Sequence, residues 1–254
     1  MRIEHITKEK DELLDIAISA VNQAGLILRE HFTLNAGIAS DKGRDIKTEA
    51  DKAADEAILK ILSSTGYSIL SEESGSKSIS GLEPSCWIID PLDGTFNFVR
   101  GFPACCVSVA LWDKRNPLLG VIYDFANDRL YYGKVGAGAF CNGLPLRVSS
   151  VNCFTQAALA TGFPTSRDFS DNALLTTIRR IQKFKKIRMI GSAALSLAYV
   201  SAGIVDAYHE EDIWLWDVAA GLALVRAAGG DFTISEIKPT WQLDVYASNG
   251  IISI

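Results

Sequence analysis

Cysteine is scarce in this chain and occurs in an odd number. The 254 residues include five cysteines, and no two of them are spaced as C-x-x-C. This count and spacing argue against both a zinc ribbon and a disulfide framework, and they favour a reducing, cytoplasmic environment. The three histidines (His5, His31 and His209) also lack the spacing of a metal site, so we expect ordinary surface or core positions for them.

Long apolar runs and an excess of positive charge are absent as well. No stretch reaches the roughly 18 apolar residues that a membrane-spanning helix needs. The first 15 residues, MRIEHITKEKDELLD, lack the apolar segment of a secretory signal. The net charge of −5 argues against a dedicated nucleic-acid binder. We therefore expect no membrane partner and no nucleic-acid partner, whereas an anionic substrate stays compatible because bound cations can invert a local field.

The composition that is present is typical of a folded enzyme-sized domain. Hydrophobic residues make up 48% of the chain and charged residues 22%, which is far from a disordered composition. A chain of this length is near the upper limit for one hydrophobic core. We therefore expect a single domain over residues 1–254, with two packed halves at about 1–145 and 146–254.

Helical and strand patterns alternate along the chain. Apolar residues recur at helical spacing over 11–33, and TEAD at 48–51 resembles a capping box, with Thr48 as N-cap and Asp51 in the position usually held by Glu. Residues 34–45 are expected to form a polar loop, and 104–141 an antiparallel meander. Further strands or helices are expected at 67–75, 85–90, 156–164, 170–184, 186–203, 204–210, 217–230, 231–234 and 245–249. The mixture predicts sheets layered with helices.

Acidic residues follow several of these apolar elements. WIIDPLDGT at 87–95 delivers Asp90 and Asp93 into one short segment, Glu72 and Glu73 follow YSIL, and Asp217 follows IWLW. Each acid alone could serve as a helix cap or face solvent. The ends of such elements tend to meet at one edge of a sheet, so these acids are expected to lie close together. Together they favour an oxygen-rich site for two or more divalent cations.

Two expected helix starts could bind an anion beside these acids. Gly94 and Thr95 precede one helix, and Gly191, Ser192 and Ala193 precede another. Free N–H groups at a helix start suit a phosphate. Cations beside a phosphate-binding helix start favour a phosphoryl-transfer reaction in which a metal-activated water is the nucleophile.

In these and neighbouring motifs the chain resembles the inositol monophosphatase family of Mg²⁺-dependent, Li⁺-sensitive phosphatases. The matching stretches span residues 45–230 and occur in the family's order: DIKTEAD, SEES, WIIDPLDGTFNFVRGFP, TGFP, GSAALSLAYVSAGIVDAY and WDVAAGLALVRAAGG. The resemblance implies an α+β or α/β fold built as a five-layer α-β-α-β-α sandwich, and a homodimer.

The resemblance also implies roles for particular residues. Two or three Mg²⁺ ions per site would be held by Glu72, Asp90, Asp93, Asp217 and the carbonyl of Leu92. Thr95, paired with Asp51, would activate the attacking water together with the ion held by Glu72. Contacts to the substrate would come from Asp93, Gly94, Thr95, Gly191, Ser192, Ala193 and Glu210.

The implied function is hydrolysis of myo-inositol 1-phosphate or a related polyol or sugar monophosphate. Relatives on the same core hydrolyse fructose 1,6-bisphosphate, histidinol phosphate or 3′-phosphoadenosine 5′-phosphate, and these activities stay open. A regulatory member that binds RNA or protein is a non-enzymatic alternative.

Two features depart from the resemblance or lie outside it. Position 96 is Phe where relatives often have Thr, and Trp214 and Trp216 occupy a segment that varies among relatives and faces the substrate. For these tryptophans we favour core positions over an aromatic wall that would suit a ring or base. The basic run RRIQKFKKIR at 179–188 is expected to be a solvated face rather than an RNA contact.

Overall fold

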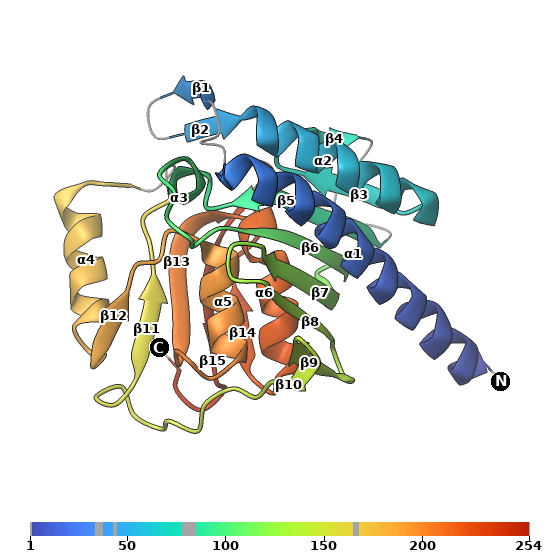
Figure 1. The fold of residues 1–254 in the computed structure, drawn as a ribbon. Coiled ribbons are helices and arrows are strands. Elements are labelled where there is room, and N and C mark those ends of the chain that lie inside the picture. Colours follow the sequence, from blue (N-terminus) through green and yellow to red (C-terminus); the bar gives the residue numbers. More distant parts are fainter. Residues whose placement is uncertain (1, 34–37, 43–44, 78–84, 165–167, 254) are drawn as a thin grey trace.

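The computed structural model describes residues 2–33, 38–42, 45–77, 85–164 and 168–253. They form five layers, α-β-α-β-α, which confirms the expected architecture (Figure 1). Helices α1 (Arg2–Thr33) and α2 (Glu49–Leu62) lie on one face of the larger sheet. Helices α5 (Ala193–Ser201) and α6 (Leu215–Ala227) lie between the two sheets, and α4 (Asp171–Ile181) lies on the outer side of the smaller sheet.

The larger sheet has eight strands in the order β10-β9-β8-β7-β6-β5-β3-β4. All neighbours pair antiparallel except β3 and β5, which are parallel. Its strands are β3 (Ser68–Ser71), β4 (Gly75–Lys77), β5 (Cys86–Asp93), β6 (Cys106–Asp113), β7 (Asn116–Asp124), β8 (Arg129–Lys134), β9 (Gly138–Cys141) and β10 (Leu144–Pro145). The run from β6 to β9 confirms the predicted meander.

The smaller sheet has five strands in the order β12-β11-β13-β15-β14. Strand β11 is parallel to both of its neighbours, and the other pairs are antiparallel. Its strands are β11 (Ala158–Thr161), β12 (Lys186–Arg188), β13 (Ala207–Trp214), β14 (Asp231–Ile234) and β15 (Gln242–Ser248). The two sheets follow one another in sequence and share the core around α5 and α6. We therefore propose that the chain is a single domain, with two halves that divide near residue 145.

Alternation along β5 explains how this strand serves two cores. Trp87 and Ile89 pack with α1 and α2, whereas Cys86 and Ile88 pack in the core that contains α5 and α6. Helix α6 is apolar on nearly every side, as a helix enclosed between two sheets must be. Burial therefore fixes both the strand that ends at Asp93 and the helix whose first turn contains Asp217.

Local signals set the start of α2. Thr48 Oγ1 accepts hydrogen bonds from the N–H groups of Ala50 and Asp51, and Asp51 Oδ2 accepts one from the Thr48 N–H at 2.6 Å. The predicted capping box is thus confirmed. A short 3₁₀ turn, η1 (Ser63–Thr65), follows the helix.

One local prediction is wrong. Residues 34–45 were expected to be a loop, but β1 (Ile38–Lys42) and β2 (Asp45–Thr48) pair as an antiparallel hairpin, with 34–37 and 43–44 outside the described residues. The segment has no clear apolar alternation, so backbone pairing was not visible from its side chains.

Among the helices of the described ranges, none has the length and apolar character needed to cross a membrane.

Replacing Gly120 with Ala should destabilise the packing of α6 on the larger sheet. A Cβ at Gly120 of β7 would lie 2.3 Å from the backbone oxygen of Ala220 and 2.9 Å from its Cα. Backbone cannot rotate away, so we expect the free energy of unfolding to fall by about 1–3 kcal/mol, measured by denaturant titration.

Gly162→Ala is the matched control for this prediction. There a Cβ would approach the far end of a flexible side chain, Glu210 Oε1, at 2.5 Å. The control should lose clearly less stability, and equal losses in the two variants would contradict the packing argument.

Candidate active site

Strand β5 presents two acids on the same side of the sheet. The expected strand ended at Asp90, but β5 continues through Pro91 to Asp93. Asp90 is opposite Ser108 and Asp93 is opposite Cys106, so three steps on β5 match two steps on β6. This bulge keeps both acids on the side of α5 and α6, although residues three apart in a regular strand face opposite sides.

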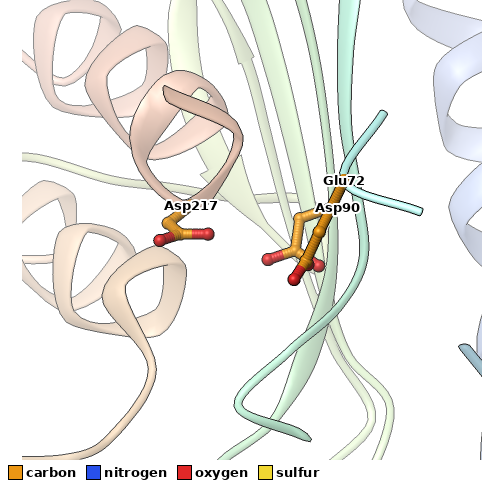
Figure 2. Close-up of side chains that lie close together, drawn as sticks. All are labelled: Glu72, Asp90 and Asp217. Carbon is orange, nitrogen blue, oxygen red and sulfur yellow. The ribbon is translucent and has the colours of Figure 1, made fainter. Parts of the chain in front are cut away.

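Two further acids join Asp90 from other elements. Glu72 directly follows β3, the parallel neighbour of β5, and its N–H donates to the carbonyl of Ile89 at 3.2 Å. Asp217 lies in the first turn of α6, which begins two residues earlier than expected. Carboxylate oxygens of Glu72, Asp90 and Asp217 all lie within 4.8 Å of one another. Figure 2 shows the Glu72 and Asp90 carboxyl groups side by side, with Asp217 facing them from the start of its helix.

The electrostatics of this cluster are unfavourable without a cation. Asp90 is 1% exposed. Burial raises its pKa well above the ordinary value, and the charges of Glu72, Asp93 and Asp217 raise it further. The pKa of Asp217 is also raised, by burial first and then by neighbouring carboxylates. A divalent cation is the usual means of keeping such a cluster ionised.

Asp93 lies beside this cluster and also holds the start of α5. Its Oδ2 accepts hydrogen bonds from the Ala194 N–H at 2.9 Å and from the Ser192 hydroxyl, and the Cys106 thiol is 3.7 Å away. Burial raises the pKa of Asp93 to about 6, with the Ser192 hydrogen bond opposing the shift. The helix start expected to bind a free anion therefore already binds a carboxylate of the protein, a long-range contact that local patterns could not show.

Thr95 lies between Asp51 and the backbone of the bulge. Its Oγ1 is 3.3 Å from Asp51 Oδ1 and 3.0 Å from the carbonyl of Leu92. Burial raises the pKa of Asp51, while its hydrogen bonds from Thr48 oppose that shift. The predicted pairing of Thr95 with Asp51 is present in the structure.

Gly94 makes the turn between β5 and α3 (Thr95–Val99). Its φ of +86° is in the left-handed region, and a Cβ there would lie 2.7 Å from the carbonyl oxygen of Ala104. Only glycine fits both the conformation and the space. The turn sets Thr95 at the first position of α3.

A cavity of about 430 Å³ is lined by most of the residues that were predicted to form the site. Its polar side chains are Glu72, Asp93, Ser192, Glu210 and Asp217, and the rest of its lining consists of Phe96, Gly162, Phe163, Pro164, Gly191, Ala193, Ile213, Trp214 and Trp216. Trp214 and Trp216 are both half-buried and both line the cavity, and Trp216 also packs against the core around α5 and α6. The preference for core positions is therefore confirmed only in part, for Trp216. Phe163 was missed, since a Phe in the TGFP loop gives no sequence signal of its own.

Comparisons with known proteins identify relatives of the chain over most of its length. Residues 9–253 match the model of the inositol monophosphatase family. The chain is 38% identical over 231 residues to inositol monophosphatase 3 of Solanum lycopersicum, covering 87% of this chain and 85% of that protein. It is 39% identical over 230 residues to the Nus factor SuhB of Escherichia coli, with coverage of 87% and 85%.

A solved structure shares the whole arrangement. The inositol monophosphatase from Anabaena (Nostoc) superposes with a TM-score of 0.82 at 36% identity, covering 95% of this chain and 92% of that one. Fold, acidic cluster and sequence therefore lead to one conclusion: the chain belongs to the inositol monophosphatase family.

Proposed function

We propose that the protein is a Mg²⁺-dependent phosphomonoesterase that hydrolyses myo-inositol 1-phosphate or a related polyol or sugar monophosphate. The observation that carries this proposal is the convergence of the Glu72, Asp90 and Asp217 carboxylates, two of which, Glu72 and Asp217, line a cavity of about 430 Å³. Family membership supports the same chemistry.

The residues of the cluster fit Mg²⁺. Hard cations prefer carboxylate and carbonyl oxygens. The pKa of Asp90 is raised by burial first and then by the neighbouring carboxylates, both of which a bound cation would offset. Glu72, Asp90, Asp93, Asp217 and the carbonyl of Leu92 would hold two or three ions. Bound there, Mg²⁺ would acidify water and neutralise the charge of the phosphate.

The chain's own groups would orient and deprotonate the attacking water. The Thr95 hydroxyl, which donates a hydrogen bond to Asp51, would accept a hydrogen bond from the attacking water, and the water's proton would move through it toward the Asp51 carboxylate. The N–H groups of Gly94 and Thr95 would hold the phosphate. Glu210, with the segment from Gly191 to Ala193, would contact the alcohol part of the substrate.

The best test is Mg²⁺-dependent phosphate release from a panel of esters. The panel comprises myo-inositol 1-phosphate, fructose 1,6-bisphosphate, histidinol phosphate and 3′-phosphoadenosine 5′-phosphate, each with Mg²⁺, with EDTA, and with added Li⁺. We expect release that requires Mg²⁺, is abolished by EDTA and is inhibited by Li⁺. If phosphate release were strongest with one of the last three esters, that ester would be identified as the preferred substrate instead. Phosphate release that persists in EDTA would contradict the proposed mechanism.

A regulatory role is the second candidate, because one relative at 39% identity is named as a Nus factor. Arg179, Lys183, Lys185, Lys186 and Arg188 of the basic run are exposed around α4 and β12. A salt-dependent gel shift with RNA would support this role, and the absence of a shift at low salt would contradict it.

We also propose that the protein forms a homodimer, and sedimentation equilibrium tests this proposal.

A further inference from the structure

The side chain of Asn97 joins three segments of the chain. Its Nδ2 donates hydrogen bonds to the carbonyl of Ala104 at 2.8 Å and to the carbonyl of Ile190 at 2.9 Å. The carbonyl oxygen of Gly191 lies 3.3 Å from the same nitrogen. Asn97 is in α3, Ala104 precedes β6, and Ile190 and Gly191 precede α5. One amide group therefore connects the helix that carries Thr95 to the turn that leads into α5.

The same turn is also bound by Asp93, through groups of the opposite kind. The Asp93 carboxylate accepts hydrogen bonds from the Ser192 hydroxyl and the Ala194 N–H. Asn97 instead donates to the carbonyls that come just before these groups. Asp93 ends β5 and Asn97 lies in the helix that follows, so the start of α5 is held by both parts of the β5–α3 connection.

Helix α3 needs such contacts because it is short. It has five residues, and no side chain caps its start at Gly94. A helix of this length is not stable in water without tertiary contacts. Phe98, which is 3% exposed, packs in the core with α1 and α2. Phe98 thus fixes α3 to one core, whereas Asn97 fixes it to the start of α5.

The Asn97 amide has no donor left for a substrate. The carbonyls of Ala104 and Ile190 lie at normal hydrogen-bond distances and use its two N–H protons, so the more distant Gly191 carbonyl can only share one of them. Among the described residues, those that line the cavity include Phe96 but not Asn97. Any effect of Asn97 on the reaction must therefore act through the groups that it holds.

We propose that Asn97 is a positioning residue that sets the distance between the two helix starts of the site. Gly94 and Thr95, at the start of α3, are the proposed phosphate contacts, and residues 191–193 precede or begin α5. The two backbones lie close together, since a Cβ on Gly94 would be 3.3 Å from the carbonyl oxygen of Gly191. Without the amide the carbonyls lose their donor, and the two starts separate. This inference rests on the proposed phosphomonoesterase function.

The first test removes the amide. Asn97→Ala should lower kcat/KM for the best ester of the panel about 10²-fold, the size of effect expected when reacting groups are misplaced by about an ångström. Asn97→Asp keeps the shape of the side chain but places a carboxylate against carbonyl oxygens, so its loss should be larger. A loss in Asn97→Asp no larger than that in Asn97→Ala would show that the two donors have no role, and it would contradict the proposal.

A matched asparagine distinguishes positioning from general stability. The Nδ2 of Asn249, which directly follows β15, donates to Ser149 Oγ at 3.0 Å and to the carbonyl of Val151 at 2.7 Å, and Asn249 is not among the described residues that line the cavity. Asn97→Ala and Asn249→Ala should both lower the melting temperature, but only Asn97→Ala should lower kcat/KM. Equal losses of kcat/KM in the two variants would indicate a structural role and overturn the proposal.

The Mg²⁺ response separates positioning from cation binding. Asn97→Ala removes no carboxylate, so Mg²⁺ should raise its melting temperature as much as it raises that of the wild type. Loss of this response would assign Asn97 to the cation site and contradict a role in setting the two helix starts.

Hydrogen exchange tests the contact independently of catalysis. Asn97→Ala should speed amide exchange severalfold in both residues 94–104 and residues 190–196, and Asn249→Ala should leave both segments unchanged. Faster exchange in residues 94–104 alone would show that Asn97 does not hold the start of α5. If the wild type releases phosphate from no ester, the proposed function fails, and this measurement then decides by itself whether Asn97 holds the two helix starts together.

Discussion

Asp90→Asn should reduce Mg²⁺-dependent phosphate release about 10³-fold. The amide keeps the shape of the side chain and can still accept the hydrogen bond from the Leu92 N–H, but it removes a buried negative charge that faces Glu72 and Asp217. A metal ligand contributes several kcal/mol to charge stabilisation, and each 1.4 kcal/mol corresponds to about tenfold in rate. Steady-state kinetics on the best substrate of the panel measures the loss.

The same substitution should stabilise the protein when no metal is present. The pKa of Asp90 is raised in the folded state, so stability is lost as the pH rises from the unfolded-state pKa through the folded-state pKa. Asn carries no charge at any pH. In EDTA at pH 7 the variant should therefore melt at a higher temperature than the wild type, and the difference should shrink toward pH 4, where the Asp90 carboxyl becomes protonated in the unfolded chain as well.

Mg²⁺ should reverse this order. A cation that binds only the folded state raises its stability by about 2.7 kcal/mol at 100 times the dissociation constant. We expect Mg²⁺ to raise the melting temperature of the wild type but hardly that of Asp90→Asn. Asp15→Asn, at an exposed acid on α1, is the control and should behave like the wild type. Near-normal turnover in Asp90→Asn would show that the acids have been assigned the wrong role.

Thr95→Val should lower kcat about 10²-fold with a smaller change in KM. Valine has nearly the shape of threonine but lacks the hydroxyl that connects Asp51 and the Leu92 carbonyl. Positioned proton transfer typically contributes at least about 10²-fold to a rate. Thr95→Ser keeps the hydroxyl and should retain most of the activity.

Melting curves distinguish this role from loss of the metal site. Because Thr95 contributes no carboxylate to the cluster, Mg²⁺ should still raise the melting temperature of Thr95→Val. If the valine variant kept at least half of the wild-type kcat, the Thr95–Asp51 pair would have no part in activating the water. If instead the Mg²⁺ response disappeared, the hydroxyl would act on cation binding.

The sequence predicted those parts of the molecule that local chemistry determines. The capping box of Thr48 and Asp51 involves residues three apart and leaves a readable pattern. The convergence of Glu72, Asp90 and Asp217 was predictable because apolar elements deliver acids at their ends. Their roles in catalysis stay predictions.

Contacts between distant segments were not predictable in the same way. That Asp93 binds the start of α5 depends on residues about 100 positions apart. The contribution of Trp214 and Trp216 to the cavity lining depends on how β13 turns into α6, because by composition the same two tryptophans would fit a core equally well. Periodicity gives the face of an element, but it does not say what lies opposite that face.

The role proposed for Asp93 as a metal ligand would link cation affinity to the packing between the two sheets. One oxygen of this carboxylate holds the N-terminus of α5, and that helix packs on α6, where Leu197 fills the space above Gly221. A shift of α5 by a fraction of an ångström would therefore move an acid of the site. Random mutagenesis for altered metal dependence should thus recover changes in this interior as well as in the cavity. Substitutions far from the proposed metal ligands would then adjust the proposed activity.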